Sequence, residues 1–254
     1  MISRYRVYLN DVEISSIDDS IYVADVSYSS LSYNRTTTKL GNRSGSYSGN
    51  EYFPENKVTV SFSVRQYDTS TRQNVIQAIN AWCRNGGWLK VSDRPDMRMY
   101  VRCSKPAVVS SILRWTDYLT VELTAYDYPF WTDEVPVTEI MEAGHEYEIY
   151  VPGVYKTDVE AVIVSSSALT NVTIECGDTA IELDGINVPA EQPITISYTD
   201  DHHILQIESG GDSLLDKRTP DSYDNLVMEP GKNVVAFSAN ASAVCTLLIK
   251  GVYL

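Results

Sequence analysis

Residues 69–103, TSTRQNVIQAINAWCRNGGWLKVSDRPDMRMYVRC, contain the pattern that decides the fold. The pattern predicts a helix, a turn and a strand, in that order. The hydroxyl residues at positions 69–71 can accept hydrogen bonds from the free N–H groups of a first helical turn. Asn85, Gly86 and Gly87 tolerate the left-handed backbone that ends a helix. The predicted helix therefore covers about residues 70–85.

The apolar residues of this helix recur at i, i+1, i+4, i+7 and i+8, so they share one side. They are Val75, Ile76, Ile79, Trp82 and Cys83, and the other side carries Arg72, Gln73, Gln77, Asn80 and Arg84. Burying one full aliphatic or aromatic side chain contributes about 1.5–3 kcal/mol. A stripe of this width must pack on a sheet, and no other stretch predicts a helix of comparable strength.

Alternation of apolar and polar residues predicts the strands of that sheet. The predicted strands cover residues 21–33, 57–65, 88–92, 97–103, 108–115 and 118–126, after a hairpin over residues 4–14. The hairpin turns at Asn10 and Asp11, residues 93–96 form a turn, and the last two strands join near Thr116 and Asp117.

Periodicity disappears between Asn34 and Phe53, where residues 41–49 are rich in glycine, serine and asparagine. We predict a loop here. A loop of this length in a compact domain is usually functional, because ordering it requires a partner. A mobile surface loop is the alternative, and the sequence does not choose between the two.

Charge divides the 254-residue chain at the Val135–Pro136 linker. Residues 1–135 carry 15 Lys and Arg against 15 Asp and Glu, and residues 136–254 carry 5 against 19. We therefore expect two domains, residues 1–135 and 136–254. The acidic second half argues against binding to nucleic acid by neutralisation of phosphates, because it has no basic stripe. A hydrophobic content of 43% excludes a disordered chain.

The second half shows short strands at regular intervals and no helical stretch, a pattern typical of a β-sandwich or jelly roll. The predicted strands cover residues 146–151, 160–165, 171–176, 180–183, 194–198, 203–208, 225–228, 233–238 and 244–252. Turns are predicted at residues 177–178, 184–185, 200–201, 210–211 and 230–231, and a loop over residues 210–224.

The first fifteen residues lack the apolar block of a signal peptide, and no apolar run approaches the roughly 18 residues that span a bilayer. We expect a soluble chain made in a cytoplasm, with no membrane insertion. The four cysteines lie far apart without a C-x-x-C pair, so buried free thiols are favoured over a disulfide or a metal site.

The search for catalytic residues is negative. No nucleophile elbow, phosphate loop or H-E-x-x-H motif is present, and Ser213 after Gly211 and Asp212 has no recognisable base. Residues 200–203, DDHH, are possible metal ligands, but adjacent strand residues point to opposite faces, so a solvated hairpin turn is favoured. We predict no catalytic, metal or cofactor-binding residues and no enzymatic activity.

Aromatic residues leave one alternative open. Eighteen tyrosines and four tryptophans could stack on sugars or on protein surfaces, although tyrosine also simply suits a half-buried sheet. A carbohydrate-binding module that recognises host-surface glycans is therefore the alternative function, weakened by the absence of tryptophan after residue 135. A glycan-processing enzyme would need an acid pair that no spacing singles out.

Several local motifs, in their order and spacing, carry a resemblance that covers essentially the whole chain. They are the hairpin ending in residues 9–11, the glycine-containing residues 41–45, the helix from Arg72 to Trp82 leading to Leu89, the turn and strand at residues 93–102, residues 126–129 (YDYP) and residues 228–233 (MEPGKN). The chain resembles the distal tail protein family of long-tailed phages and prophages.

The resemblance implies a mainly β fold: an N-terminal β-sandwich or split barrel with one packed helix, followed by a galectin-like, jelly-roll β-sandwich. It implies a homohexameric ring at the distal end of the virion tail, between the tail-tube protein and the tail-tip hub or tail-associated lysin. The second domain would project outward and hold receptor-binding or side-fibre proteins. DNA would only pass through the ring lumen, no cofactor would be bound, and synthesis would take place in the host bacterial cytoplasm.

A closed ring needs one interface repeated head to tail. We expect the segment from Asn34 to Phe53 to cross to the neighbouring subunit or to the stacked ring. The candidate interface residues are Arg35, Arg43, Tyr47 and Tyr52, with Arg43 as a polar anchor.

Overall fold

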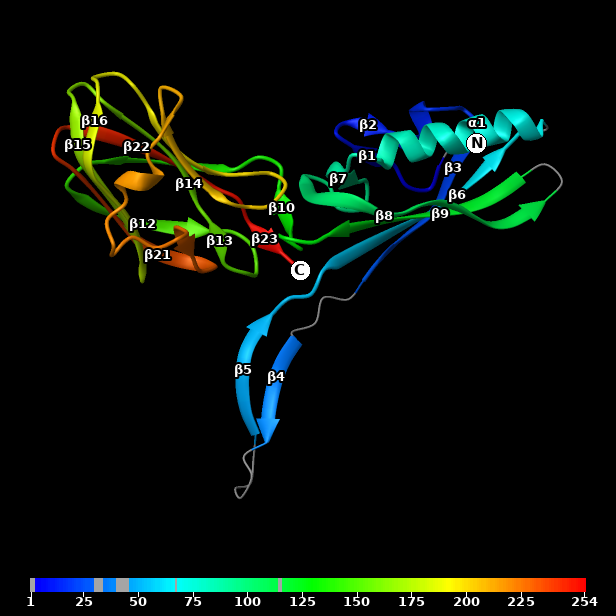
Figure 1. The fold of residues 1–254 in the computed structure, drawn as a ribbon, viewed down its shortest axis with the longest axis horizontal. Helices are drawn as coiled ribbons and strands as arrows, with labels where there is room; N and C mark the ends of the chain where they lie inside the picture. Colours follow the sequence, from blue (N-terminus) through cyan, green and yellow to red (C-terminus); the bar gives the residue numbers. More distant parts are fainter. Residues whose placement is uncertain (1–2, 30–33, 40–45, 67, 114–115) are drawn as a thin grey trace. The chain divides into compact units, whose positions relative to one another are not determined.

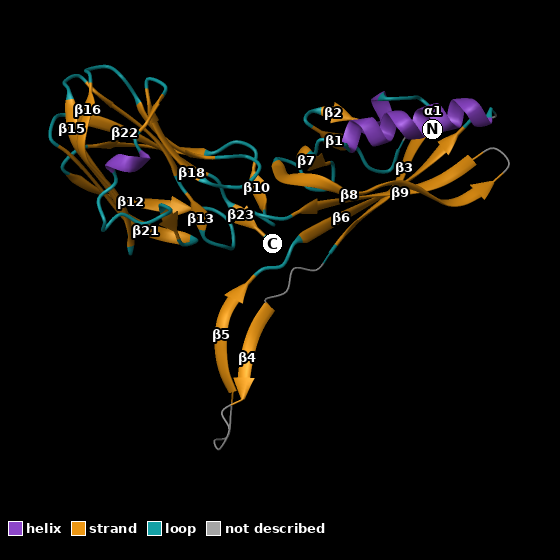
Figure 2. Cartoon of the chain, in the orientation of Figure 1, coloured by secondary structure: helices purple, strands orange, loops and turns teal. Residues whose placement is uncertain are grey.

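The structure is a computed structural model that describes residues 3–29, 34–39, 46–66, 68–113 and 116–254. It is mainly β, with one α-helix among the described residues, as Figure 2 shows. The chain divides into two compact units, Met1–Phe130 (unit 1) and Trp131–Leu254 (unit 2). Each unit is described by itself below.

Unit 1 is built on an antiparallel sheet of strand order β2-β1-β7-β8-β9-β6-β3 (Figure 1). The strands are β1 (Val7–Leu9), β2 (Val12–Glu13), β3 (Ile21–Tyr28), β6 (Asn56–Arg65), β7 (Gly87–Val91), β8 (Met97–Leu113) and β9 (Thr116–Ala125). The predicted alternation is confirmed in the centre of the sheet, where Val60 pairs with Val121 and Phe62 with Leu119. All four side chains are buried.

Two predictions for this sheet are wrong. The strands expected over residues 97–103 and 108–115 are one strand, β8, and Thr116 and Asp117 belong to β9. The pairing register of β8 with β9 shifts at several points between Cys103 and Ser111. Bulges of this kind insert unpaired residues and break the alternation in the sequence, so one bent strand imitates two.

The helix α1 (Thr69–Cys83) packs on β8 and β6, as predicted. Its cap differs from the expectation, because the carboxylate of Asp68 accepts a hydrogen bond of 2.8 Å from the N–H of Thr71. Val75, Ile79 and Cys83 are buried, whereas Ile76 and Trp82 are half-buried. Arg72, expected on the solvent side, is buried as well.

The N-terminal hairpin is confirmed, and its turn is tied to the end of the helix. Asn10 and Asp11 have φ of 50° and 63°, the left-handed values of a tight two-residue turn. The Asn10 amide donates to the carbonyl of Gly86 at 3.1 Å and accepts from the N–H of Trp88 at 3.0 Å. A Cβ at Gly87 would lie 2.1 Å from the Asn10 side chain, so this position requires glycine.

Unit 2 contains the β-sandwich expected from the sequence. One sheet has the order β11-β22-β14-β17-β18-β19 and the other β12-β21-β15-β16. Their strands are β11 (Val137–Glu142), β12 (His145–Val151), β14 (Glu160–Ser165), β15 (Leu169–Cys176), β16 (Thr179–Val188), β17 (Ile194–Tyr198), β18 (Leu205–Ser209), β19 (Asp212–Ser213), β21 (Gly231–Ala239) and β22 (Ala243–Ile249). Inward side chains of both sheets, such as Ile163, Ile174, Phe237 and Leu247, form one core.

Smaller pairs of strands complete unit 2. β13 (Thr157–Asp158) pairs with β20 (Val227–Met228), and β10 (Trp131–Asp133) pairs with β23 (Val252–Tyr253). The turn predicted at Asp184 and Gly185 is wrong, because both residues lie within β16, which changes register there. The loop predicted over residues 210–224 contains β19 and the 3₁₀ helix η2 (Leu215–Lys217). A second 3₁₀ helix, η1 (Ile14–Ser16), lies in unit 1.

Candidate interaction surfaces

The first candidate surface is a hairpin made of β4 (Asn34–Lys39) and β5 (Ser46–Tyr52), which pair antiparallel in a two-stranded sheet of their own. The prediction of a loop here is therefore wrong. These strands consist of threonine, serine, tyrosine, asparagine, glycine and charged residues, without an aliphatic residue. The sequence therefore shows no alternation of apolar and polar residues here. Threonine and tyrosine still favour extended backbone, and this weaker signal could have found them.

The hairpin lies in sequence between β3 and β6, the edge pair of the unit 1 sheet, but it forms a separate sheet. Tyr28 faces Val58 in the β3–β6 pair, and Asn34 faces Tyr52 in the β4–β5 pair. On each strand these two positions are six residues apart. Within the hairpin the register shifts by one residue between Arg35 and Thr37.

The predicted interface residues fall on this hairpin, with one exception. Arg35 faces Glu51, Tyr47 faces Thr38, and Tyr52 faces Asn34. Arg43 lies outside the described residues. Three of the four candidate residues therefore lie together on one hairpin. They belong to paired strands rather than to the loop that the sequence predicted.

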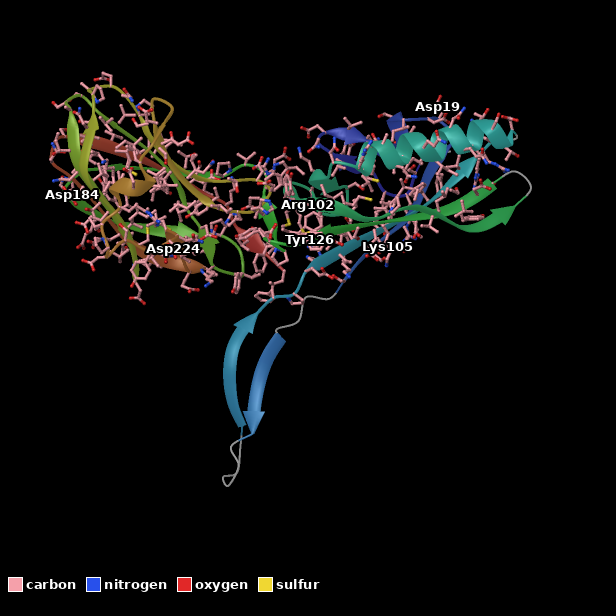
Figure 3. All side chains as sticks on the ribbon, viewed as in Figure 1. Asp19, Arg102, Lys105, Tyr126, Asp184 and Asp224 are labelled. Atoms are coloured by element: carbon pink, nitrogen blue, oxygen red, sulfur yellow. The ribbon has the colours of Figure 1, made fainter. Side chains whose placement is uncertain are left out.

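A second surface is the face of the unit 1 sheet opposite α1, on which Figure 3 places Lys105 and Tyr126. The Lys105 ammonium lies 2.8 Å from the Glu122 carboxylate, and this hydrogen bond lowers the pKa of Glu122. Tyr118 and Val108 are exposed on the neighbouring strands. Balanced charge and exposed aromatic and aliphatic groups make this face suitable for contact with another protein.

The two outer faces of the unit 2 sandwich differ strongly. On the β12-β21-β15-β16 sheet, Glu146, Glu148 and Glu175 are exposed, and Lys232 bridges Glu148 at 2.6 Å. This face is acidic, and its charged residues alternate with the buried ones, as expected for an antiparallel sheet with one solvated side.

The β11-β22-β14 side instead presents aliphatic residues, which we call the aliphatic face: Ile140, Val162, Val164, Val244 and Leu248. Pairing places them on adjacent strands, since Thr246 stands between Ile140 and Val162, and Val244 pairs with Val164. Ile140 is 65% and Val244 42% exposed.

Sequence reasoning missed this face. Its signal was the unbroken apolar run at residues 161–164, AVIV, where a one-sided antiparallel strand would alternate. Glu142 and Glu208 are exposed on strands of the same sheet, and Glu160 binds Lys250 at 2.8 Å.

A hydrogen-bonded cluster around His203 lies in unit 2. The Nε2 atom of His203 is 2.8 Å from Oδ2 of Asp158, and the Asn225 amide donates to Oδ1 at 3.0 Å. The His203 ring stacks on Tyr198, whose pKa is raised mainly by burial. Asp158 is 45 residues from His203 in the sequence. No local sequence motif could therefore predict that the two side chains pair.

The other residues considered for chemistry lie in a turn and on a short strand. Asp200, Asp201 and His202 lie in the turn between β17 and β18, as predicted, and Ser213 lies in β19. Within the described residues, no three His, Cys, Asp or Glu side chains gather as metal ligands. In the same part of the chain, no helix is long and apolar enough to cross a membrane.

Solved structures share this architecture over nearly the whole chain. The chain matches the crystal structure of the Dit protein of phage SPP1 with a TM-score of 0.71 and 14% sequence identity, covering 97% of this chain and 98% of that one. The chain has the fold of a phage distal tail protein. That SPP1 protein is described as a paradigm of the hub adsorption apparatus in phages that infect Gram-positive bacteria.

The distal tail fold also matches chains of the phage P2 baseplate in its activated conformation. With Ca the TM-score is 0.53 at 9% identity, covering 99% of this chain and 98% of that one. With Sr the TM-score is 0.50 at 8% identity, covering 96% and 97%. No protein-family model matches the sequence, and no curated protein matches it significantly. The match to these solved structures therefore rests on the fold, at sequence identities of 8–14%.

Proposed function

We propose that this chain is a structural protein of a phage virion, located at the distal end of the tail, where it joins the tail tube to the tail-tip hub or tail-associated lysin. One observation carries the proposal: the distal tail protein fold is matched over 97% of the chain, in both units rather than in a single common sandwich. The protein has no enzymatic role, needs no cofactor, and meets DNA only as it passes through the lumen.

The assembly we propose is a homohexameric ring formed by unit 1. Residues 1–130 carry 15 Lys and Arg against 13 Asp and Glu, so copies of unit 1 can pack without strong repulsion. The β4–β5 hairpin reaches the neighbouring subunit or the stacked ring and supplies Arg35, Arg43, Tyr47 and Tyr52 to the interface. Extended strand edges readily form such contacts between chains.

Unit 2 has the opposite charge character. Residues 131–254 carry 5 Lys and Arg against 21 Asp and Glu, which keeps copies of unit 2 apart and in solvent. We assign the aliphatic face to a peripheral receptor-binding or side-fibre protein. The exposed carboxylates of Glu142 and Glu208 on the same sheet favour a partner whose apolar patch is bordered by lysine or arginine.

The test is the assembly state of the purified chain, measured by light scattering and negative-stain imaging, alone and with tail-tube protein as a template. We expect sixfold rings for the wild type. The triple variant Arg35→Ala/Tyr47→Ala/Tyr52→Ala should lose them, while the control Thr37→Ala/Ser48→Ala on the same hairpin retains them. Intact rings after deletion of residues 34–52 would remove the hairpin from the interface.

The alternative, a carbohydrate-binding module for host glycans, is supported by the exposed tyrosines of unit 2, Tyr150 and Tyr223, at 72% and 51% exposure. A glycan array separates the two proposals. Saturable sugar binding by a chain that stays monomeric with the tail-tube template would favour the module.

A further inference from the structure

We propose that Cys83 and Cys103 form a redox-active dithiol pair that oxidises to a disulfide within one chain. Their Sγ atoms lie 3.3 Å apart, within hydrogen-bonding reach for sulfur. A disulfide bond is about 2.05 Å long, so oxidation requires an approach of only about 1.3 Å. The chemistry involves unit 1 alone and is independent of the proposed function.

The fold itself brings the two thiols together. Cys83 is the last residue of α1, and Cys103 pairs with Leu123 in the β8–β9 register. The chain then leaves the helix through Gly86, whose φ is 67° and whose N–H donates to the carbonyl of Cys83 at 3.1 Å. A Cβ at Gly86 would lie 2.3 Å from the carbonyl oxygen of Val101. This close passage over β8 holds the helix end against the strand.

The two thiols differ in solvent exposure, and this difference decides which of them reacts first with an oxidant. Cys103 is half-buried and meets an oxidant first, whereas Cys83 is fully buried. Burial, followed by the hydrogen bond to Cys103, raises the pKa of Cys83 to about 12. Cys83 is therefore a poor first nucleophile in bulk solution and is suited to attack an already oxidised neighbour.

The reaction balances with a peroxide as oxidant. The Cys103 thiolate attacks one oxygen of hydrogen peroxide, the O–O bond breaks, and Cys103 sulfenic acid and hydroxide form. The sulfur of Cys83 then attacks the Cys103 sulfur, its proton goes to the hydroxide, and the S–O bond breaks to release a second hydroxide, which takes up the proton lost by Cys103. The net change is two thiols and one peroxide to one disulfide and two waters.

The remaining cysteines provide an internal control. Cys176 and Cys245 are buried in unit 2, and burial raises the pKa of each thiol to about 12. Cys245 also contributes to the raised pKa of Cys176, but the hydrogen bond between two sulfurs in the described part of the chain joins Cys83 and Cys103. They share the low reactivity of Cys83 but lack an accessible neighbour.

The experiment treats the reduced full chain with hydrogen peroxide and counts thiols after denaturation. We expect loss of two of the four thiols, a mass loss of two hydrogens, and a Cys83–Cys103 crosslinked peptide. Cys83→Ala and Cys103→Ala should each abolish the crosslink, whereas Cys176→Ala and Cys245→Ala should retain it. Cys83→Ala should instead show a trappable sulfenic acid at Cys103.

A stability readout follows from the same sample. The disulfide closes a loop of about 20 residues and should raise the melting temperature of unit 1 by about 5–10 °C. Tryptophan fluorescence follows this transition, because three of the four tryptophans belong to unit 1. Four intact thiols in the oxidised wild-type chain, or a crosslink between other cysteines, would overturn the proposal without reliance on any variant.

Discussion

Unit 1 covers its sheet with a helix, unit 2 covers one sheet with another, and the two interiors differ in chemistry. Unit 1 buries a charged pair, Arg72 and Asp117, with Nε 3.4 Å from Oδ2 and side chains 7% and 10% exposed. In the described part of unit 2, the buried polar residues are uncharged hydroxyl residues, Thr132, Thr157, Ser165 and Ser209. The described part of this very acidic unit has no charged residue in the fully buried class, and its Asp158 side chain, beside His203, is 12% exposed.

This difference indicates which interactions fix the orientation of the packed layers in each unit. Two sheets packed face to face are held in place by interdigitating rows of side chains from many strands. One helix on a sheet can rotate or slide more easily, and a buried ion pair between its first turn and β9 penalises such shifts. We therefore expect unit 1 to respond most to loss of a charge and unit 2 to loss of volume.

The largest expected effect is a loss of volume in unit 2. Phe237→Ala removes a ring that is 1% exposed and should cost about 3–5 kcal/mol of unfolding free energy. Urea denaturation of the full chain should show unit 2 unfolding earlier, with the transition of unit 1 unchanged. Val234→Ala, on the outer face of the same strand, is the matched control and should cost less than about 1 kcal/mol. A parallel shift of both transitions would show that the interiors are not independent.

The next effect tests the charged pair of unit 1. Arg72→Met leaves Asp117 buried without its cation and should cost about 3 kcal/mol, whereas Arg72→Met/Asp117→Leu should recover most of the loss. Lys232→Met is the control in unit 2, because its bridge to Glu148 is 66% exposed on both sides and should contribute about 0–1 kcal/mol. Equal costs for the single and double variants would mean that the arginine acts through packing alone.

The smallest effect concerns the helix cap and depends on pH. Hydrogen bonds from Ser70 and from the N–H of Thr71 lower the pKa of Asp68 to about 2. Because this value lies below the unfolded pKa, the cap stabilises α1 fully above about pH 4, and the contribution disappears as the pH falls toward 2. Asp68→Ala should lower the melting temperature of unit 1 at neutral pH, with a difference from wild type that narrows over this range.

Asp68→Asn sharpens the same prediction. The asparagine oxygen still accepts the cap hydrogen bond but does not titrate, so the stability of this variant should not fall with the protonation of residue 68. Helical circular dichroism during thermal unfolding at several pH values measures all three proteins. Identical pH profiles for the wild type and both variants would show that the cap carboxylate contributes nothing.

The elements that depend on residues close together in the sequence could be predicted from the sequence. Alternation at Val58, Val60, Phe62 and Val64 placed a central strand, and the left-handed preferences of Asn10 and its neighbour placed a hairpin turn. Apolar spacing placed the helix to within one or two residues at each end.

The features that sequence reasoning missed depend on residues far away. Arg72 is buried because Asp117 is beside it, and Cys83 meets Cys103 because the chain passes closely over β8. The β4–β5 hairpin contains no aliphatic residue, so its strands show no alternation of apolar and polar residues. Its pairing therefore cannot be seen in a short window of sequence.

The separate sheet of the hairpin also restricts where the gene can change in length. The residues between Tyr28 and Asn34 and between Tyr52 and Val58 lie outside the pairs of the hairpin. One residue inserted there leaves those pairs unchanged, whereas one residue inserted within β4 or β5 would shift the pairs beyond it and exchange the two faces of that part. Natural variants of this protein should therefore change length in the joining segments rather than within the two strands.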